Sequence, residues 1–242
     1  MSRPHAGGFP WLGPEDQYQF PDCESADADG VIGVGGNLSP GMLLSAYRHG
    51  IFPWFNPEDP IIWWCPDPRF VLYLDEVHVS RSMARLLRQD RFRFTLDEAF
   101  GSVIHACAVT PRRGQAGTWI TEDMELGYRR LHELGHAHSC EVWSGDRLVG
   151  GIYGVSIGRM FFGESMFSHE DNASKVALIT LSRFLLDQGF DVMDVQLHTP
   201  HVERLGGRAI PRSEFLHVVE ERIRQPGPSG SWADLLTSIS ST

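Results

Sequence analysis

The sequence has no hydrophobic run long enough to cross a membrane. Its longest apolar stretches, around residues 61–65 and 148–155, are far shorter than the roughly 20 residues that a membrane-spanning helix needs. Residues 1–20 also lack the continuous apolar segment of a secretory signal. We therefore expect a globular chain that resides in the cytoplasm and has no membrane partner.

Cysteines are few, and none lies near another in the sequence. Cys23, Cys65, Cys107 and Cys140 form no Cys-x-x-Cys pair. This spacing indicates isolated reduced thiols rather than a disulfide framework or a zinc site. We expect no catalytic role for them.

One short match to a metal motif occurs at residues 132–136, where His-Glu-Leu-Gly-His fits the His-Glu-x-x-His pattern of zinc proteases. That chemistry requires both imidazoles on one face of a continuous helix. Gly135 falls where the apolar helical pattern from Met124 to Leu134 stops, so His136 should lie beyond the helix end. The pattern favours an ordinary helix C-terminus with polar His side chains. We predict no metal site.

The chain also lacks an excess of positive charge. Its formal net charge is −10, which taken alone argues against a nucleic-acid partner. The distribution is uneven, because residues 77–113 contain seven arginines against three carboxylates, whereas the remainder has 14 basic and 28 acidic residues. Charge is therefore segregated, with one basic region in an acidic protein.

The first part of the chain combines a Gly- and Pro-rich start, a helical pattern near residues 39–50 and an aromatic loop with several prolines. Ser39 is the expected helix cap, Pro40 suits the first turn and Gly50 the end. We predict a small N-terminal domain at residues 1–67.

The rest of the chain, which is long enough and apolar enough for a sizeable core, predicts a second domain at residues 68–225. Three helical patterns precede strand patterns at 138–144, 147–157 and 158–167, whose short turns indicate an antiparallel meander. A helix at 173–188 and a strand at 190–197 follow. Helices around a mainly antiparallel sheet indicate an α+β fold. The polar residues 226–242 predict a mobile tail.

Five ordered blocks stand out between residues 30 and 215. They are VGGNLSPGMLLSAYRHGIFPWFNPEDPIIWWCPDPR at 34–69, GTWIT at 117–121, LHELGHAHSCEVW at 131–143, LVGGIYGVSIGRMFFGESMFSHEDNASKVAL at 148–178 and DVQLHTPHVERLGG at 194–207. Together they resemble the leucyl/phenylalanyl-tRNA protein transferase family, and blocks of this length are far more specific than a short motif. Two positions depart from the family pattern, Asn37 in place of Asp and Cys65 in place of Ser.

The resemblance implies an aminoacyltransferase that takes leucine or phenylalanine, and less readily methionine, from its aminoacyl-tRNA. The acceptor would be a protein with N-terminal Lys or Arg, and the product a peptide bond that creates an N-degron for protein degradation. The resemblance also implies a GNAT-like acyltransferase core. Residues 163–175 stand where an acetyltransferase has its Gly-rich pyrophosphate loop, so neither coenzyme A nor another cofactor is implied. We expect a monomer.

The resemblance places four apolar residues around a pocket for the amino-acid side chain. They are Ile152, Phe161, Met166 and Met193. Unbranched methionine adapts to Leu, Phe and Met alike. Periodicity alone would assign these residues to an ordinary sheet core.

Two tryptophans match family positions that contact the donor's 3′ adenosine, Trp54 in the Pro-rich loop and Trp119 before a predicted helix. An indole offers a stacking face to a base. Tryptophan is also a common core residue, but loops are the usual places for recognition.

Three polar residues are the candidates for the chemistry. Glu164 interrupts an apolar strand pattern and needs a partner there, and the resemblance suggests that it faces the donor's α-amino group or adenosine. Asp194 and Gln196, two apart on a predicted strand, would sit at the reacting centre. Gln196 would orient the incoming amine, and Asp194 would accept its proton or stabilise its charge, unless Asp194 only makes a structural hydrogen bond. Ser168, Asn172, Ser174 and Lys175 would cap and anchor the next helix.

Arg81, Arg85 and Arg88 are spaced by four and three residues, which puts them on one helical face. They match the family's basic patch that contacts tRNA, although an exposed solvated face is the common alternative for such a run. Two other functions stay open. One is an N-acyltransferase that uses another acyl donor, such as coenzyme A or a cell-wall precursor, and the other is a noncatalytic RNA-binding module.

Overall fold

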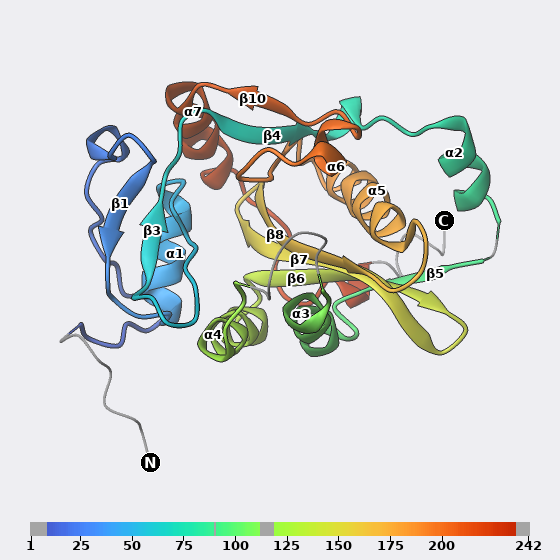
Figure 1. Ribbon diagram of the computed structural model, residues 1–242, viewed down its shortest axis with the longest axis horizontal. Helices are drawn as coiled ribbons and strands as arrows, with labels where there is room; N and C mark the ends of the chain where they lie inside the picture. Colours follow the sequence, from blue (N-terminus) through green and yellow to red (C-terminus); the bar gives the residue numbers. More distant parts are fainter. Residues whose placement is uncertain (1–8, 90, 112–118, 236–242) are drawn as a thin grey trace, which may run out of the picture.

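The computed structural model describes residues 9–89, 91–111 and 119–235. Its main element is a seven-stranded sheet with the strand order β10-β4-β9-β8-β7-β6-β5 (Figure 1). Neighbouring strands are antiparallel except for the parallel pair β8 and β9. The predicted α+β architecture with a mainly antiparallel sheet is confirmed.

The predicted meander and the helix that follows it form as expected. The strands of the large sheet are β4 (Arg69–Tyr73), β5 (Arg93–Leu96), β6 (Ala137–Ser144), β7 (Arg147–Ile157), β8 (Met160–Ser168), β9 (Val192–Asp194) and β10 (Arg208–Ile210). The helices around it are α2 (Arg81–Leu87), α3 (Phe100–Val109), α4 (Glu122–Glu133), α5 (Ala173–Asp187), α6 (Pro200–Glu203) and α7 (Arg212–Ile223), with a short 3-10 turn at Leu74–Glu76.

Both faces of the central strands are covered, with α5 on one side and α3 and α4 on the other (Figure 1). Adjacent residues therefore point to different cores: Phe161 packs with the α5 side and Phe162 with the α3 and α4 side. A Cβ on Gly150 of β7 would lie only 2.6 Å from the Cβ of Ala173. Glycine at this position thus lets the first turn of α5 lie directly on the sheet.

The N-terminal segment forms a separate small sheet, β1-β3-β2, beside a buried helix. Its elements are a 3-10 turn at Cys23–Ser25, β1 (Val31–Val34), α1 (Pro40–Arg48), β2 (Phe52–Pro53) and β3 (Ile62–Trp64). Helix α1 confirms the helix predicted near 39–50, and Gly50 follows it with a positive φ of 71°. One buried cluster contains Leu43 of α1 together with Tyr128 of α4. The division into domains at 1–67 and 68–225 stays a prediction.

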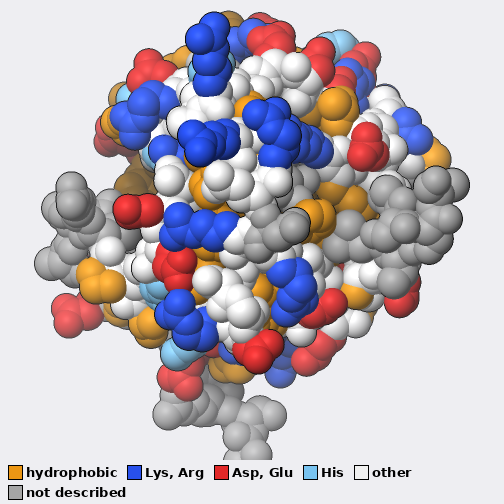
Figure 2. Space-filling model, turned by 90° about the vertical axis from the view of Figure 1, so that its right-hand side faces the viewer, with side chains coloured by type: hydrophobic (Ala, Val, Ile, Leu, Met, Phe, Trp, Pro, Cys, Tyr) orange, Lys and Arg blue, Asp and Glu red, His pale blue; other side chains and the backbone are white. Residues whose placement is uncertain are grey.

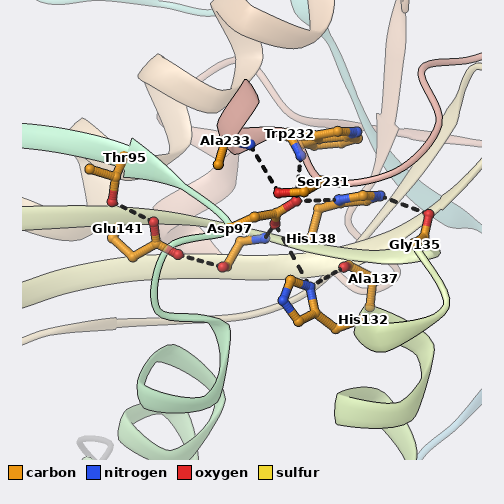
Figure 3. A network of polar contacts seen from close by, with 11 residues as sticks. Thr95, Asp97, His132, Gly135, Ala137, His138, Glu141, Ser231, Trp232 and Ala233 are labelled. Carbon is orange, nitrogen blue, oxygen red and sulfur yellow. Dashed lines mark hydrogen bonds and ion pairs between the residues drawn. The ribbon is translucent and has the colours of Figure 1, made fainter. Parts of the chain in front are cut away.

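The segment after α7 differs from the mobile tail predicted for 226–242. Trp232 is fully buried, and its indole stacks on the His138 ring with 3.8 Å between centroids (Figure 3). Its backbone N–H donates to Asp97 Oδ2 at 2.8 Å, and His138 Nδ1 lies 2.8 Å from the same oxygen. The segment is polar in composition but contains one large apolar residue, Trp232, which packs against His138 of β6. Residues 236–242 lie outside the described residues.

The His132–His136 stretch forms the predicted helix end. His132 belongs to α4, whereas His136 follows Gly135, whose φ is +76°. The His132 ring stacks on Phe100 with 4.3 Å between centroids. Within the described ranges, no cluster of His, Cys, Asp or Glu is arranged to hold a metal ion, and no helix is long and apolar enough to span a membrane.

Candidate active site

A cavity of about 710 Å³ lies between β8, α5 and the α6 region. Ile152, Met166 and Met193, predicted to bind the amino-acid side chain, line it together with Glu164. Phe161 is fully buried and packs near Trp232, with 5.9 Å between ring centroids, and the cavity lining does not include it. Phe161 therefore belongs to the core under α5, behind the residues that line the cavity, and does not form the cavity surface.

Glu164 is the polar end of this cavity and meets side chains from three other parts of the fold. Tyr47 of α1 donates to Glu164 Oε1 at 2.7 Å, and Tyr128 of α4 donates to Oε2 at 2.8 Å. The Gln196 side-chain amide donates to Oε1 at 2.7 Å. The sequence predicted that this carboxyl needs a partner, and its partners are neutral groups: two tyrosine hydroxyls and one side-chain amide.

The two tyrosines also touch each other, and this contact bears on the charge of Glu164. The hydroxyl oxygens of Tyr47 and Tyr128 lie 2.5 Å apart. With an ionised Glu164, two hydroxyl protons must serve three short contacts. A proton on Glu164 completes the ring, because the carboxyl then donates to one tyrosine, which donates to the other, which donates back.

The environment of Glu164 agrees with that proton count. Burial is the largest cause of a raised pKa, which moves from an ordinary 4.5 to about 7; the hydrogen bonds from Tyr47, Tyr128 and Gln196 oppose this shift, and the charge of Asp194 adds to it. Glu164 therefore changes its charge near neutral pH.

Asp194 is held in a buried ion pair. Arg69 Nε donates to Asp194 Oδ1 at 2.8 Å and Arg69 Nη2 donates to Oδ2 at 2.7 Å, and both side chains are fully buried. The Arg69 guanidinium lies between the rings of Phe52 and Phe215, 4.6 and 4.4 Å from their centroids. Asp194 thus makes structural hydrogen bonds, which were the alternative to a role in proton transfer, and its side-chain partner is Arg69.

Gln196 does not share a strand face with Asp194, which corrects the geometry expected from the sequence. Strand β9 ends at Asp194, and Gln196 has a positive φ of 63°. The chain turns so that the Gln196 backbone N–H donates to Asp194 Oδ1 at 2.9 Å while its side chain reaches Glu164. Gln196 thus links the two carboxyl groups by a backbone turn.

The two tryptophans predicted to contact adenosine do not line this cavity. Trp54 follows β2, is 37% exposed and packs against Trp64 with 5.6 Å between centroids. Trp119 is half-buried and packs against the core that contains α3 and α4. Their role toward the donor stays a prediction, and residues 117 and 118 of the same block lie outside the described residues.

The predicted basic patch lies on the surface. Arg81 and Arg85 belong to α2, Arg88 is its C-cap, and all three are exposed. Ser80 caps the helix by accepting from the Met83 backbone N–H, and Met83 is the buried residue of α2. Helix α2 therefore presents its arginines to solvent. Arg112 and Arg113 of the basic region lie outside the described residues.

Sequence reasoning missed four residues at or near the site. They are Tyr47, Arg69, Tyr128 and His201. A tyrosine on the apolar face of a predicted helix needs a hydrogen-bond partner when buried, which was the available signal for Tyr47 and Tyr128. His201 lines the cavity, and its Nε2 is buried without a hydrogen-bond partner among the described residues. Burial, followed by the charges of Lys175 and Arg204, lowers the pKa of His201 and favours its neutral form.

Comparisons with known proteins match nearly the whole chain. The family model described as leucyl/phenylalanyl-tRNA protein transferase matches residues 71–220, and the model for the N-terminal domain of that family matches residues 36–67. The leucyl/phenylalanyl-tRNA–protein transferase of Syntrophus aciditrophicus is 54% identical over 88% of this chain and 90% of that protein. The protein of the same name from Pseudomonas aeruginosa is 51% identical over 91% of this chain and 97% of that protein.

Solved structures match more distantly. A GCN5-related N-acetyltransferase-like protein from Streptococcus suis has a TM-score of 0.33 at 19% identity, over 59% of each chain. L-PGS from Bacillus licheniformis has a TM-score of 0.38 at 11% identity, over 62% of this chain and 48% of that chain. The family models and the relatives of 51–54% identity decide the assignment: the chain belongs to the leucyl/phenylalanyl-tRNA protein transferase family.

Proposed function

We propose that this chain transfers leucine or phenylalanine, and less readily methionine, from charged tRNA to the N-terminal Lys or Arg of an acceptor protein. The peptide bond formed creates an N-degron. Family membership supports the reaction class. The observation that carries the proposal is the cavity itself. Its apolar wall is formed by Ile152, Met166 and Met193, and its polar end is the buried carboxyl of Glu164 with the two tyrosines that contact it.

The reaction is an aminolysis of an ester. The acceptor's amine attacks the ester carbonyl carbon, a C–N bond forms, the C–O bond to the ribose breaks, and the ribose hydroxyl leaves with a proton while the amine loses one. The apolar wall holds the amino-acid side chain, and the Glu164 cluster binds the donor's polar end. Most of the rate in such a site comes from holding the amine and the ester in contact.

Gln196 and Asp194 are the residues that we propose act on the incoming amine. Gln196 orients the amine, because its position is fixed by hydrogen bonds to both Glu164 and Asp194. Both oxygens of Asp194 already accept from Arg69, so accepting the amine's proton requires giving up part of this ion pair. This pairing favours stabilisation of the ammonium charge over full proton transfer.

We also propose that the donor's adenosine contacts Trp54 and Trp119, that tRNA phosphates contact Arg81, Arg85 and Arg88, and that the protein acts as a cytoplasmic monomer. Exposed arginines on α2 support phosphate contact.

One assay tests the proposal. The protein is incubated with tRNA charged with leucine, phenylalanine or methionine and with a model protein that begins with Arg or Lys, and mass spectrometry detects the added residue. A model protein that begins with Ala is the control and should stay unmodified. Product formation from acyl-coenzyme A without tRNA would favour the other acyltransferase, and tRNA binding without any product would favour the noncatalytic RNA-binding module.

A further inference from the structure

A second, smaller cavity lies between α2 and the first turn of α5. It measures about 330 Å³ and is lined by Ser80, Ser82, Met83, Arg85, Leu86, Gln89, Asn172 and Lys175. Two cationic side chains and two hydroxyls from segments far apart in the sequence therefore face one space. Lys175 is the only lysine of the chain.

The cations of this cavity have no carboxylate partner in the described part of the chain. Lys175 Nζ donates to Asn172 Oδ1 at a long 3.3 Å, and neither Lys175 nor Arg85 takes part in an ion pair there. Nearby arginines behave differently, because Arg91 and Arg147 both pair with Glu170. In a protein of net charge −10, cations left without acidic partners are suited to an external anion.

The α2–α5 cavity adjoins the active-site cavity along the backbone of α5. Ser174 lines the active-site cavity and the next residue, Lys175, lines the smaller one. The charge of Lys175 also reaches the active-site wall, where it contributes to lowering the pKa of His201. Lys175 therefore stands between the cavity for the amino acid and the exposed arginines of α2.

The surrounding surface has the charge that a nucleic-acid strand requires. Figure 2 shows the face of the molecule that lies to the right in Figure 1, where α2 and β5 lie; Lys and Arg side chains gather across its middle and upper part, and most acidic side chains lie toward the periphery. Helix α2 carries Arg81 and Arg85 and ends at Arg88, and all three are exposed. A single strand leaving the active site across this face would meet Lys175 first and α2 next.

We infer that the α2–α5 cavity binds a phosphodiester of the donor's single-stranded 3′ end, with Lys175 and Arg85 as the cationic contacts. The Ser80 and Ser82 hydroxyls, which are hydrogen-bonded to each other at 3.0 Å, leave one hydroxyl proton as a neutral donor. This inference rests on the proposed function, because it assigns the path of the donor strand. A lysine ammonium and an arginine guanidinium that line the same cavity supply charge-assisted hydrogen bonds to one phosphate. Lys175 is thus a donor-binding residue, beyond its contact with Asn172 in the first turn of α5.

The test uses three donors that differ in phosphate content: aminoacyl-adenosine, which has no phosphodiester, an aminoacylated cytidyl-cytidyl-adenosine trinucleotide, and charged tRNA. For Lys175→Gln we expect KM to rise about tenfold with the trinucleotide and with tRNA, and to stay unchanged with aminoacyl-adenosine. Lys175→Arg should restore most of the loss. The dependence of log KM on log salt for the trinucleotide should become shallower by about 0.7 in Lys175→Gln.

Two further variants separate a shared phosphate site from general electrostatics. Arg183→Gln removes the same charge from an exposed position of α5 outside this cavity and should leave all three donors unaffected. Arg85→Gln should raise KM for the trinucleotide, and the double variant with Lys175→Gln should lose less than the product of the single effects, because both cations hold one phosphate.

A loss in Lys175→Gln that is equal for all three donors, or absent with the trinucleotide, would overturn the inference. Failure of the proposed function looks different, since the unmodified protein would then transfer no amino acid from any of the donors. Thermal melts of each variant exclude unfolding as the cause of a loss.

Discussion

At the scale of single residues, the charge of Glu164 depends on its immediate neighbours. A carboxyl with a pKa of about 7 inside the fold and an ordinary 4.5 outside it binds its proton more strongly when the chain is folded. This contribution to stability is complete below the unfolded pKa of 4.5 and is lost as pH rises through 7. Its full size is about 3 kcal/mol.

Glu164→Gln is expected to weaken transfer from all three charged tRNAs by a similar factor, because glutamine keeps the shape but alters the ring of hydrogen bonds that holds the donor's polar end. In the wild type the unfolding free energy should decrease between pH 5 and 8, and in Glu164→Gln this decrease should be much smaller. Urea unfolding across this range measures the slope. Glu141 is fully buried, and burial is the main cause that raises its pKa to about 7, so it titrates in the same pH range. Glu141 does not line the cavity, so Glu141→Gln is the matched control for the effect on transfer. A variant of Glu164 that kept the full slope would contradict the assignment.

Met166 forms part of the cavity wall, and its side chain is only partly buried. Met166→Ala and Met166→Val are expected to change the choice among Leu, Phe and Met donors by about 1–3 kcal/mol, because discrimination by an apolar pocket depends on fit. The measurement is kcat/KM for each of the three charged tRNAs. Unchanged preference in folded variants would assign Met166 to ordinary core packing.

Asp194 combines a proposed role in turnover with a structural one. Removing its side chain leaves Arg69 buried and unpaired, which costs about 3–5 kcal/mol, so Asp194→Ala will lose stability as well as activity. Asp194→Asn removes the charge and keeps one acceptor oxygen, which serves Arg69 Nε and the Gln196 backbone N–H, while its amide group replaces the acceptor of Arg69 Nη2. We expect kcat to fall more than donor binding in Asp194→Asn. Full turnover by this variant, with stability checked by urea unfolding, would show that the charge of Asp194 is dispensable.

At the scale of elements, periodicity predicted most of the helices and strands because each has a covered face and a clear end. Helix α1 starts at Pro40 after Ser39, whose side chain makes no capping hydrogen bond, and α4 starts after Thr121; Gly50 and Gly135 follow the ends of these helices. The cap of Thr121 is formed, since its hydroxyl accepts from the Met124 backbone N–H at 3.2 Å.

The candidate site was less predictable, since it depends on contacts between distant elements. The strand predicted at 190–197 ends at Asp194, because Gln196 adopts a left-handed conformation. No local sequence pattern predicts this conformation. The pairing of Asp194 with Arg69 joins residues 125 positions apart. Glu164 could be singled out from the sequence as a polar residue in an apolar strand that needs a partner, but the sequence did not identify Tyr47, Tyr128 and Gln196 as its partners.

Helix α2 is short and held by Met83, so its arginines contribute charge rather than packing. Arg81→Ala and Arg85→Ala are expected to weaken charged-tRNA binding and to make its salt dependence shallower by about one per removed contact, while transfer from aminoacyl-adenosine survives. Filter binding at several salt concentrations measures the slope. Arg183→Ala, at an exposed position of α5, is the control. Equal losses with both donors would reject phosphate contact by α2.

At the scale of the whole molecule, the site lies where the two predicted domains meet. Tyr47 comes from the N-terminal segment, whereas Tyr128, Glu164 and Gln196 come from the larger part of the chain. Helix α1 therefore completes the environment that sets the charge of Glu164. The small sheet and α1 thus contribute to the active site as well as to stability.

The C-terminal segment packs on the α5 side of the large sheet through Trp232, which contacts His138 and Phe184 with 3.8 and 5.1 Å between ring centroids. Trp232→Ala is expected to reduce the unfolding free energy by about 3–5 kcal/mol, because it empties a fully buried site. Trp232→Phe should lose less, since it keeps an aromatic ring and removes an indole N–H that has no partner among the described residues. Urea unfolding gives both losses, and kcat/KM for three charged tRNAs should show an unchanged donor preference in Trp232→Phe. Wild-type stability in Trp232→Ala would mean that this segment is not anchored in solution, as the composition of residues 226–242 had suggested.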